Sequence, residues 1–139
     1  MRNLFNILFL CLIISISATQ SLRAEKINKI IISGNERISD ETLIVYGDIK
    51  KNEDYTQNDI DTIIKNLYDT KFFSNISINF SGGILKINVI ENPIINSITL
   101  QGEPTKKFTK ALKNFMSLKE KSSYLKSDVK NDVEIIKSF

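Results

Sequence analysis

The sequence predicts an α+β protein made of tandem units. The first contains a strand, two helices and a two-stranded hairpin, and the second is truncated before its hairpin. Three observations support this fold class: an amphipathic helix that runs into a hairpin at residues 55–93, a strand and a capped helix just before it, and a partial repeat of this order 68 residues later. Because short helices and single hairpins are marginal alone, we expect these elements to pack on one another.

The amphipathic helix begins after Thr56. Its apolar residues recur at i, i+3, i+4, i+7 and i+8, which is one face of a helix with a 3.6-residue period. They are Ile60, Ile63, Ile64, Leu67 and Tyr68. Thr56 is expected to cap the helix, because Asp59 stands three residues later in the position of a capping box.

Two segments of alternating apolar and polar residues follow this helix. A period of two indicates strands with one buried face. Between them, Gly82 and Gly83 supply the positive φ angles that a two-residue hairpin turn needs. The residues expected to face the core are Ile76, Ile78, Phe80, Leu85, Ile87 and Val89.

Another strand and a short helix are expected upstream. The β-branched run Ile27–Ile32 predicts the strand, and Gly34 follows it in a turn. Ser39 is expected to cap a helix that ends at Gly47. The loop between this helix and the next, residues 48–54, is mostly polar.

The first 24 residues have the features of a secretory signal peptide. Arg2 precedes the apolar run Leu4–Ile16, and small residues follow it. We expect cleavage after Ala24, with Ala18 as a competing site. The apolar run is shorter than the roughly 20 residues that usually span a membrane, so we favour cleavage over the alternative of an uncleaved anchor.

Composition excludes several classes of function. The chain has no histidine, and its only cysteine, Cys11, lies in the leader, so Ser–His and Cys–His catalytic pairs are excluded. Two of the 19 basic residues also lie in the leader, which leaves 17 against 16 acidic residues and no charge that favours nucleic acid. Asp128 and Asp132 share a helix face, which we interpret as solvated. We therefore predict no enzyme activity, no cofactor and no metal site.

A second, partial unit is expected at residues 93–139. Ile95, Ile98, Leu100 and Gly102 repeat Ile27, Ile30, Ile32 and Gly34. Two apolar stripes predict helices, one with Phe108, Leu112, Phe115 and Met116 and the other with Val129, Val133 and Ile136. Tandem units of one size indicate a modular array. No hairpin follows the second helix, so we expect the chain to be the front of a longer protein.

Two motifs connect these elements to a known family. They are Ile27-x-x-Ile30-x-Ile32-x-Gly34-Asn35-x-Arg37-Ile38-Ser39 and Leu67-Tyr68-x-Thr70-x-Phe72-Phe73. They resemble POTRA domains, specifically those at the front of the BamA family of outer-membrane protein assembly factors. The resemblance is stronger up to Asn92 than beyond it, and Lys71 departs from the glycine that the family usually has there. The resemblance to POTRA domains implies a three-stranded mixed sheet covered by two helices.

The resemblance also implies boundaries and a function. It divides the chain into a signal peptide (1–24), a first POTRA domain (25–92) and a partial second one (93–139). It implies a periplasmic role in receiving unfolded outer-membrane β-barrel proteins and docking accessory lipoproteins, in a protein held in the membrane by a barrel beyond residue 139. The alternatives are a POTRA module of a two-partner secretion pore or of a cell-division protein anchored in the inner membrane.

The candidate binding site is one strand of the hairpin. In the resembling domains, the first hairpin strand lies at the sheet edge, where unpaired N–H and C=O groups can accept another chain as an added strand. We therefore predict an edge that binds clients or partners. Its residues are Asn75, Ile76, Ser77, Ile78 and Asn79. The alternation alone leaves open which of these amides face outward.

Overall fold

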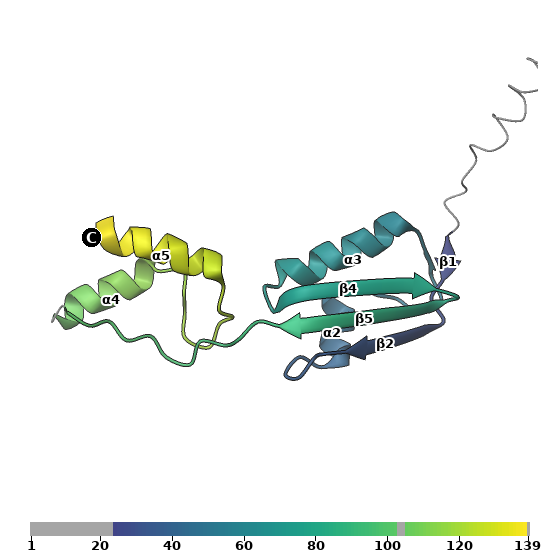
Figure 1. Cartoon of the computed structure of the whole chain (residues 1–139), viewed down its shortest axis with the longest axis horizontal. Helices are drawn as coiled ribbons and strands as arrows, with labels where there is room; N and C mark the ends of the chain where they lie inside the picture. Colours follow the sequence, from purple (N-terminus) through teal and green to yellow (C-terminus); the bar gives the residue numbers. More distant parts are fainter. Residues whose placement is uncertain (1–23, 103–104, 139) are drawn as a thin grey trace, which may run out of the picture.

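The structure is a computed structural model that describes residues 24–102 and 105–138. The predicted signal peptide, apart from Ala24, lies outside the described residues. A sheet covered by helices occupies residues 25–92, and a pair of helices follows it (Figure 1). Each helix in the described part of the chain is too short or too polar to cross a membrane.

The sheet contains three strands in the order β2-β5-β4. β2 (Lys29–Ser33) pairs in parallel with β5 (Ile84–Glu91), and β4 (Phe73–Ser81) pairs antiparallel with the other side of β5. Figure 1 shows β5 between its two neighbours. The predicted α+β fold with a three-stranded mixed sheet is therefore confirmed.

Two helices cover one face of this sheet. α2 (Asp40–Tyr46) is capped by Ser39, and α3 (Gln57–Asp69) by Thr56 in a complete capping box with Asp59. Hydrogen bonds from the side chain and the backbone amide of Thr56 hold the pKa of Asp59 below its usual value. The expected caps are thus present, and they fix where each helix starts.

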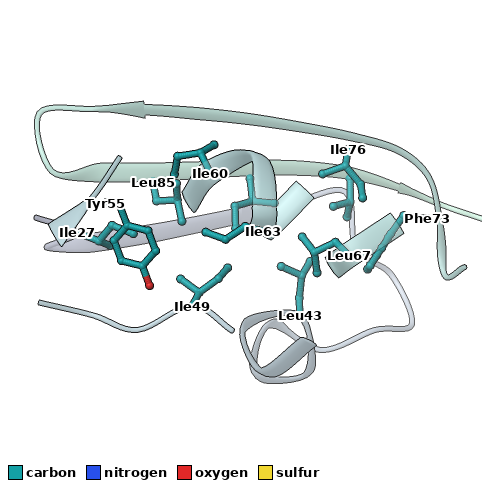
Figure 2. Packing of buried hydrophobic residues seen from close by; sticks show 12 residues of the cluster. Ile27, Leu43, Ile49, Tyr55, Ile60, Ile63, Leu67, Phe73, Ile76 and Leu85 are labelled. Carbon is teal, nitrogen blue, oxygen red and sulfur yellow. The ribbon is translucent and has the colours of Figure 1, made fainter. Parts of the chain in front are cut away.

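The core lies between the helices and the sheet. β5 contributes its most buried residues, Leu85, Ile87 and Val89, each at most 1% exposed. α3 contributes Ile60, Ile63 and Leu67, and α2 contributes Leu43; Figure 2 shows side chains of both helices gathered against the sheet. Each of these side chains gains about 1.5–3 kcal/mol on burial, so the faces that the sequence pattern indicated stabilise one another.

A second, two-stranded sheet was not anticipated from the sequence. β1 (Glu25–Lys26) pairs antiparallel with β3 (Asp54–Tyr55), and Ile27 and Ile49 are buried beside it. The Tyr55 hydroxyl accepts a hydrogen bond of 2.8 Å from the amide of Lys50. Strands of two residues are too short to produce a detectable period, so the segment at 48–54 looked like a polar loop.

Gly34 is required by a close approach of two strands. Its φ is +83°, and a Cβ atom at this position would lie 2.0 Å from the carbonyl oxygen of Val89. Next to it, the Asn35 side-chain amide donates to the Ile38 carbonyl and to the Asp40 carboxylate, both at 2.8 Å. The glycine and asparagine of the first motif therefore shape the turn between β2 and α2.

The end of β5 is tied to this same turn by Glu91. Its Oε1 accepts hydrogen bonds of 2.9 Å from the amides of Glu36, Arg37 and Ile38. Its Oε2 lies 2.8 Å from Arg37 Nε as an ion pair that lacks the angle of a hydrogen bond. Burial acts to raise the pKa of Glu91, but the three amides and the Arg37 charge outweigh it and hold the pKa below its usual value.

The helices after the sheet match the expected stripes only in part. α4 (Lys106–Phe115) buries Leu112, whereas Phe115 is largely exposed. On α5 (Lys126–Ser138), Val133 is 42% exposed, and so is Ile136. The repeat of the first strand forms no ladder within the described residues. At its start, Ile94 forms an isolated bridge with Ser123, and Ile95 makes backbone hydrogen bonds with Lys121 and Ser122.

Asp132 is buried, so the interpretation of its helix face as solvated was wrong. Its side chain accepts hydrogen bonds from the amides of Ser117, at 2.6 Å, and Leu118, at 2.9 Å. Those amides follow the end of α4. The carboxylate therefore joins α5 to the connection after α4, which is a structural role.

Replacing Glu91 by glutamine tests the tie between β5 and the turn. Because the folded-state pKa of Glu91 is lowered, its contribution is present above the unfolded-state pKa near 4.5 and is lost as the pH falls through the folded value. We expect Glu91→Gln to lower the free energy of unfolding at pH 7 by about 1–2 kcal/mol and to flatten its decline at acid pH. Urea unfolding from pH 7 to 3 measures both.

Glu53→Gln is the matched control, because Glu53 is exposed. An acid decline that is equally steep in Glu91→Gln and the parent protein would contradict this account of Glu91.

Candidate strand-pairing edge

β4 is the outer strand on the hairpin side of the sheet, and the turn determines which of its amides face outward. Gly82 and Gly83 have φ angles of +60° and +72°, and Ser81 stands opposite Ile84. In such two-residue hairpins the flanking pair is hydrogen-bonded, and bonded and non-bonded pairs then alternate along the strands. The amides of Asn75, Ser77 and Asn79 therefore point to β5.

The amides of the intervening residues point away from the sheet. These residues are Ile76, Ile78 and Phe80, which stand opposite Val89, Ile87 and Leu85. Their side chains lie on the face covered by the helices, since they are buried or half-buried against the core. These three residues therefore direct their side chains to the core and their backbone groups to the open edge.

This geometry divides the predicted site residues. All five lie in β4, but only Ile76 and Ile78 direct their backbone groups outward, whereas Asn75, Ser77 and Asn79 bond to β5. Phe80 also faces outward and was not among the predicted residues. Counting back from the two-glycine turn in steps of two would have found it.

The start of β4 is closed to further pairing. The amide of Ile76 donates a hydrogen bond of 3.1 Å to the hydroxyl of Tyr68, which reaches it from α3. The register shifts between Phe73 and Asn75, and the Ser74 hydroxyl donates to the Ile90 carbonyl at 3.1 Å. A bulge of this kind bends a strand and interrupts its ladder.

The end of β4 near the turn is open. Among the described residues, the outward amides of Ile78 and Phe80 have no hydrogen-bond partner. A pocket of about 290 Å³ lies beside them, formed by the start of α3, the short β1–β3 sheet and β4. Its lining residues are Glu25, Tyr55, Thr56, Gln57, Ile60, Ile78 and Phe80. Its lining is mainly polar, and Ile60, Ile78 and Phe80 add apolar contact next to the unpaired backbone groups, a combination that suits an extended peptide.

The edge offers hydrogen bonds and apolar contact as its chemistry. In the part of the chain that the structure describes, no group of three or more histidine, cysteine, aspartate or glutamate side chains could hold a metal ion. Glu25 is the one acidic residue that lines the pocket, and its Oε1 already accepts a hydrogen bond of 2.5 Å from the Gly83 amide.

The family of the sheet-and-helix unit follows from comparison with known domains. The model of the POTRA family, described as a surface antigen variable number repeat, matches residues 25–92. Residues 25–92 belong to the POTRA family. The three-stranded sheet with two covering helices and the two sequence motifs all lie within this POTRA domain.

Two curated relatives carry the name outer membrane protein assembly factor BamA. The chain is 28% identical over 79 residues to the protein of Neorickettsia risticii, and 33% identical over 76 residues to that of Neisseria meningitidis serogroup B. These alignments cover 57% and 55% of the chain but only 11% and 10% of the relatives. The chain thus spans about a tenth of the length of the relatives that it matches.

A solved structure has the same fold. The N-terminal domain of Omp85 from Thermosynechococcus elongatus superposes with a TM-score of 0.55 at 11% identity, over 83% of this chain and 50% of that one. At this identity the likeness concerns the fold. The POTRA domain described here is therefore similar in sequence to BamA proteins and in fold to Omp85.

The second POTRA motif contains one strained residue. Lys71 has a φ of +62°, in the left-handed region, and its carbonyl accepts a hydrogen bond of 2.9 Å from the side-chain amide of Asn92. This conformation costs a residue with a Cβ atom about 1–2 kcal/mol, whereas glycine adopts it readily. The departure from the usual glycine therefore leaves the turn intact but adds strain.

Lys71→Gly should stabilise the POTRA domain. Glycine removes the free-energy cost of the positive φ angle. This gain exceeds the cost of ordering a glycine, which has more entropy in the unfolded chain, so we expect the free energy of unfolding to rise by about 0.5–1 kcal/mol. Urea unfolding at pH 7 measures it. Lys71→Ala is the matched control, because alanine removes the charge and keeps the Cβ atom; equal stability of the two variants would contradict the strain at Lys71.

Proposed function

We propose that this chain is the periplasmic front of a BamA-like outer-membrane protein assembly factor, and that its POTRA domain receives unfolded β-barrel proteins by strand addition at β4. The observation that carries the proposal is the open half of β4, with the outward backbone groups of Ile78 and Phe80 beside a pocket of mixed polar and apolar lining. The names of the BamA relatives supply the biological setting. The proposed activity is binding, without turnover or cofactor.

Pairing through the backbone suits many clients. A strand that adds to an edge bonds through N–H and C=O groups that every sequence has, apart from the missing N–H of proline. Outer-membrane barrels consist of strands with alternating apolar residues. A strand added to β4 would place every second side chain on the helix side, next to the pocket at Ile60 and Phe80.

β2 is the other outer strand of the sheet and the competing edge. It has five residues against nine in β4, and it begins with Lys29. Lysine on an edge strand disfavours pairing with another chain. In addition, no residue of β2 lines the pocket beside the open half of β4. These features favour β4 as the client-binding edge.

Residues 93–139 are proposed to be part of a second POTRA unit, which would dock accessory lipoproteins together with the first. The order of α4 and α5 after an extended segment matches the order of α2 and α3 after β2. The proposed setting is the periplasmic side of the outer membrane, after removal of a signal peptide that ends at Ala24. Secretion pores and anchored cell-division proteins remain the alternative settings for a POTRA module.

The amino terminus and the membrane fraction of the native protein test this setting. We expect a mature chain that begins at Glu25 and fractionates with the outer membrane, as measured by amino-terminal sequencing and density-gradient separation. A chain that retains Leu4–Ile16 and fractionates with the inner membrane would contradict the proposal and support the cell-division alternative.

Binding of a model strand tests the proposed mechanism. The probe is an acetylated, amidated octapeptide of alternating valine and threonine, titrated into the ¹⁵N-labelled exported form of the chain. We expect the largest shifts at the amides of Ile78 and Phe80, because their outward N–H groups gain an acceptor.

The matched control is the same octapeptide with its four central amides N-methylated, which removes donors and keeps the side chains. We expect it to bind at least tenfold more weakly, because about two backbone hydrogen bonds are lost. Equal binding of both peptides, or shifts confined to β2 or the helices, would rule out strand addition at β4.

A further inference from the structure

We propose that Tyr68 sets the limit of strand addition on β4, so that a client strand pairs with Ile78 and Phe80 and stops before Ile76. This inference rests on the proposed function of the edge. It gives Tyr68 the role of a positioning residue, because its hydroxyl occupies a backbone donor that the client would otherwise use.

The geometry of the edge leads to this role. Outward amides recur at every second residue of β4, at Ile76, Ile78 and Phe80. Of these three, Ile76 alone has a partner within the described residues, the Tyr68 hydroxyl at 3.1 Å. To pair with Ile76, a client would have to displace the Tyr68 hydroxyl, which exchanges one hydrogen bond for another with little net gain.

Tyr68 does more than fill the core. Tyr68 is 41% exposed, whereas Leu67 beside it on α3 is fully buried. The tyrosine therefore lies at the rim, where its hydroxyl can reach over the edge strand while its ring rests on the domain. Because the Ser74 bulge closes the strand beyond Ile76, the tyrosine and the bulge together block the start of β4.

The open half of β4 coincides with the pocket. Ile78 and Phe80 line it together with Ile60 of α3 and Gln57 at the helix start, whereas Tyr68 and Ile76 do not. A client strand limited to this half would have its helix-side residue directed into the pocket. Tyr68 would thus set the register of the added strand as well as its length.

Tyr68→Phe tests the inference, because it removes the hydroxyl and keeps the ring. With the valine–threonine octapeptide, we expect the affinity to rise about 2–10-fold, since Ile76 can then donate one more backbone hydrogen bond to the client. Amide hydrogen exchange is then compared with and without the peptide. The peptide should slow exchange at Ile78 and Phe80 in both the parent protein and Tyr68→Phe, but should slow exchange at Ile76 only in Tyr68→Phe.

Tyr46→Phe is the matched control, because Tyr46 is also half-exposed, packs on Phe72 and does not line the pocket beside β4. We expect this variant to bind the octapeptide like the parent protein. An unchanged or lower affinity of Tyr68→Phe, or peptide protection of Ile76 in the parent protein, would overturn the role of Tyr68. Failure of the octapeptide to bind either protein would instead reject strand addition at β4, so the two failures are distinct.

Discussion

The POTRA domain depends on β5 being paired on both sides. β5 bonds to β2 in parallel and to β4 antiparallel, and its inward side chains are the most buried in the sheet. Parallel pairing requires a long crossover, which α2 and α3 provide, and the crossover brings both helices onto one face. At the end of β5, Glu91 accepts hydrogen bonds from the amides of Arg37 and Ile38, which lie in the turn where the crossover starts. Sheet order, helix placement and turn geometry therefore follow from the central position of one strand.

The same constraint creates the open edge. With β5 in the middle, β4 has a neighbour on one side, and its two-residue turn directs alternate backbone groups to the other side. A tyrosine hydroxyl and a bulge close the start of this edge, and the remainder lies beside a pocket of mixed polar and apolar lining. Outer strands are commonly protected against unwanted pairing. Under the proposed function, this partial protection would confine client pairing to the half of β4 next to the turn.

Much of the fold was predictable because its signals are local. The stripe of α3, its capping box at Thr56 and Asp59, and the glycine turn of the hairpin each depend on residues a few positions apart. The β1–β3 pair escaped prediction because two-residue strands have no period, and burial of Asp132 escaped it because its partners are amides 14 and 15 residues away. The candidate edge was located by family resemblance, and the turn geometry then identified its outward amides. Tyr68 was assigned to the apolar stripe, since no sequence pattern reveals where a hydroxyl points.

Intermolecular nuclear Overhauser effects between the chain and the bound octapeptide are the decisive test of strand addition at β4. We predict contacts between amide protons of the peptide and those of Ile78 and Phe80, in the pattern of two neighbouring strands, and none to the amide of Ile76. Contacts to β2, to the exposed face of the helices, or through side chains alone would contradict the claim that β4 receives clients by strand addition.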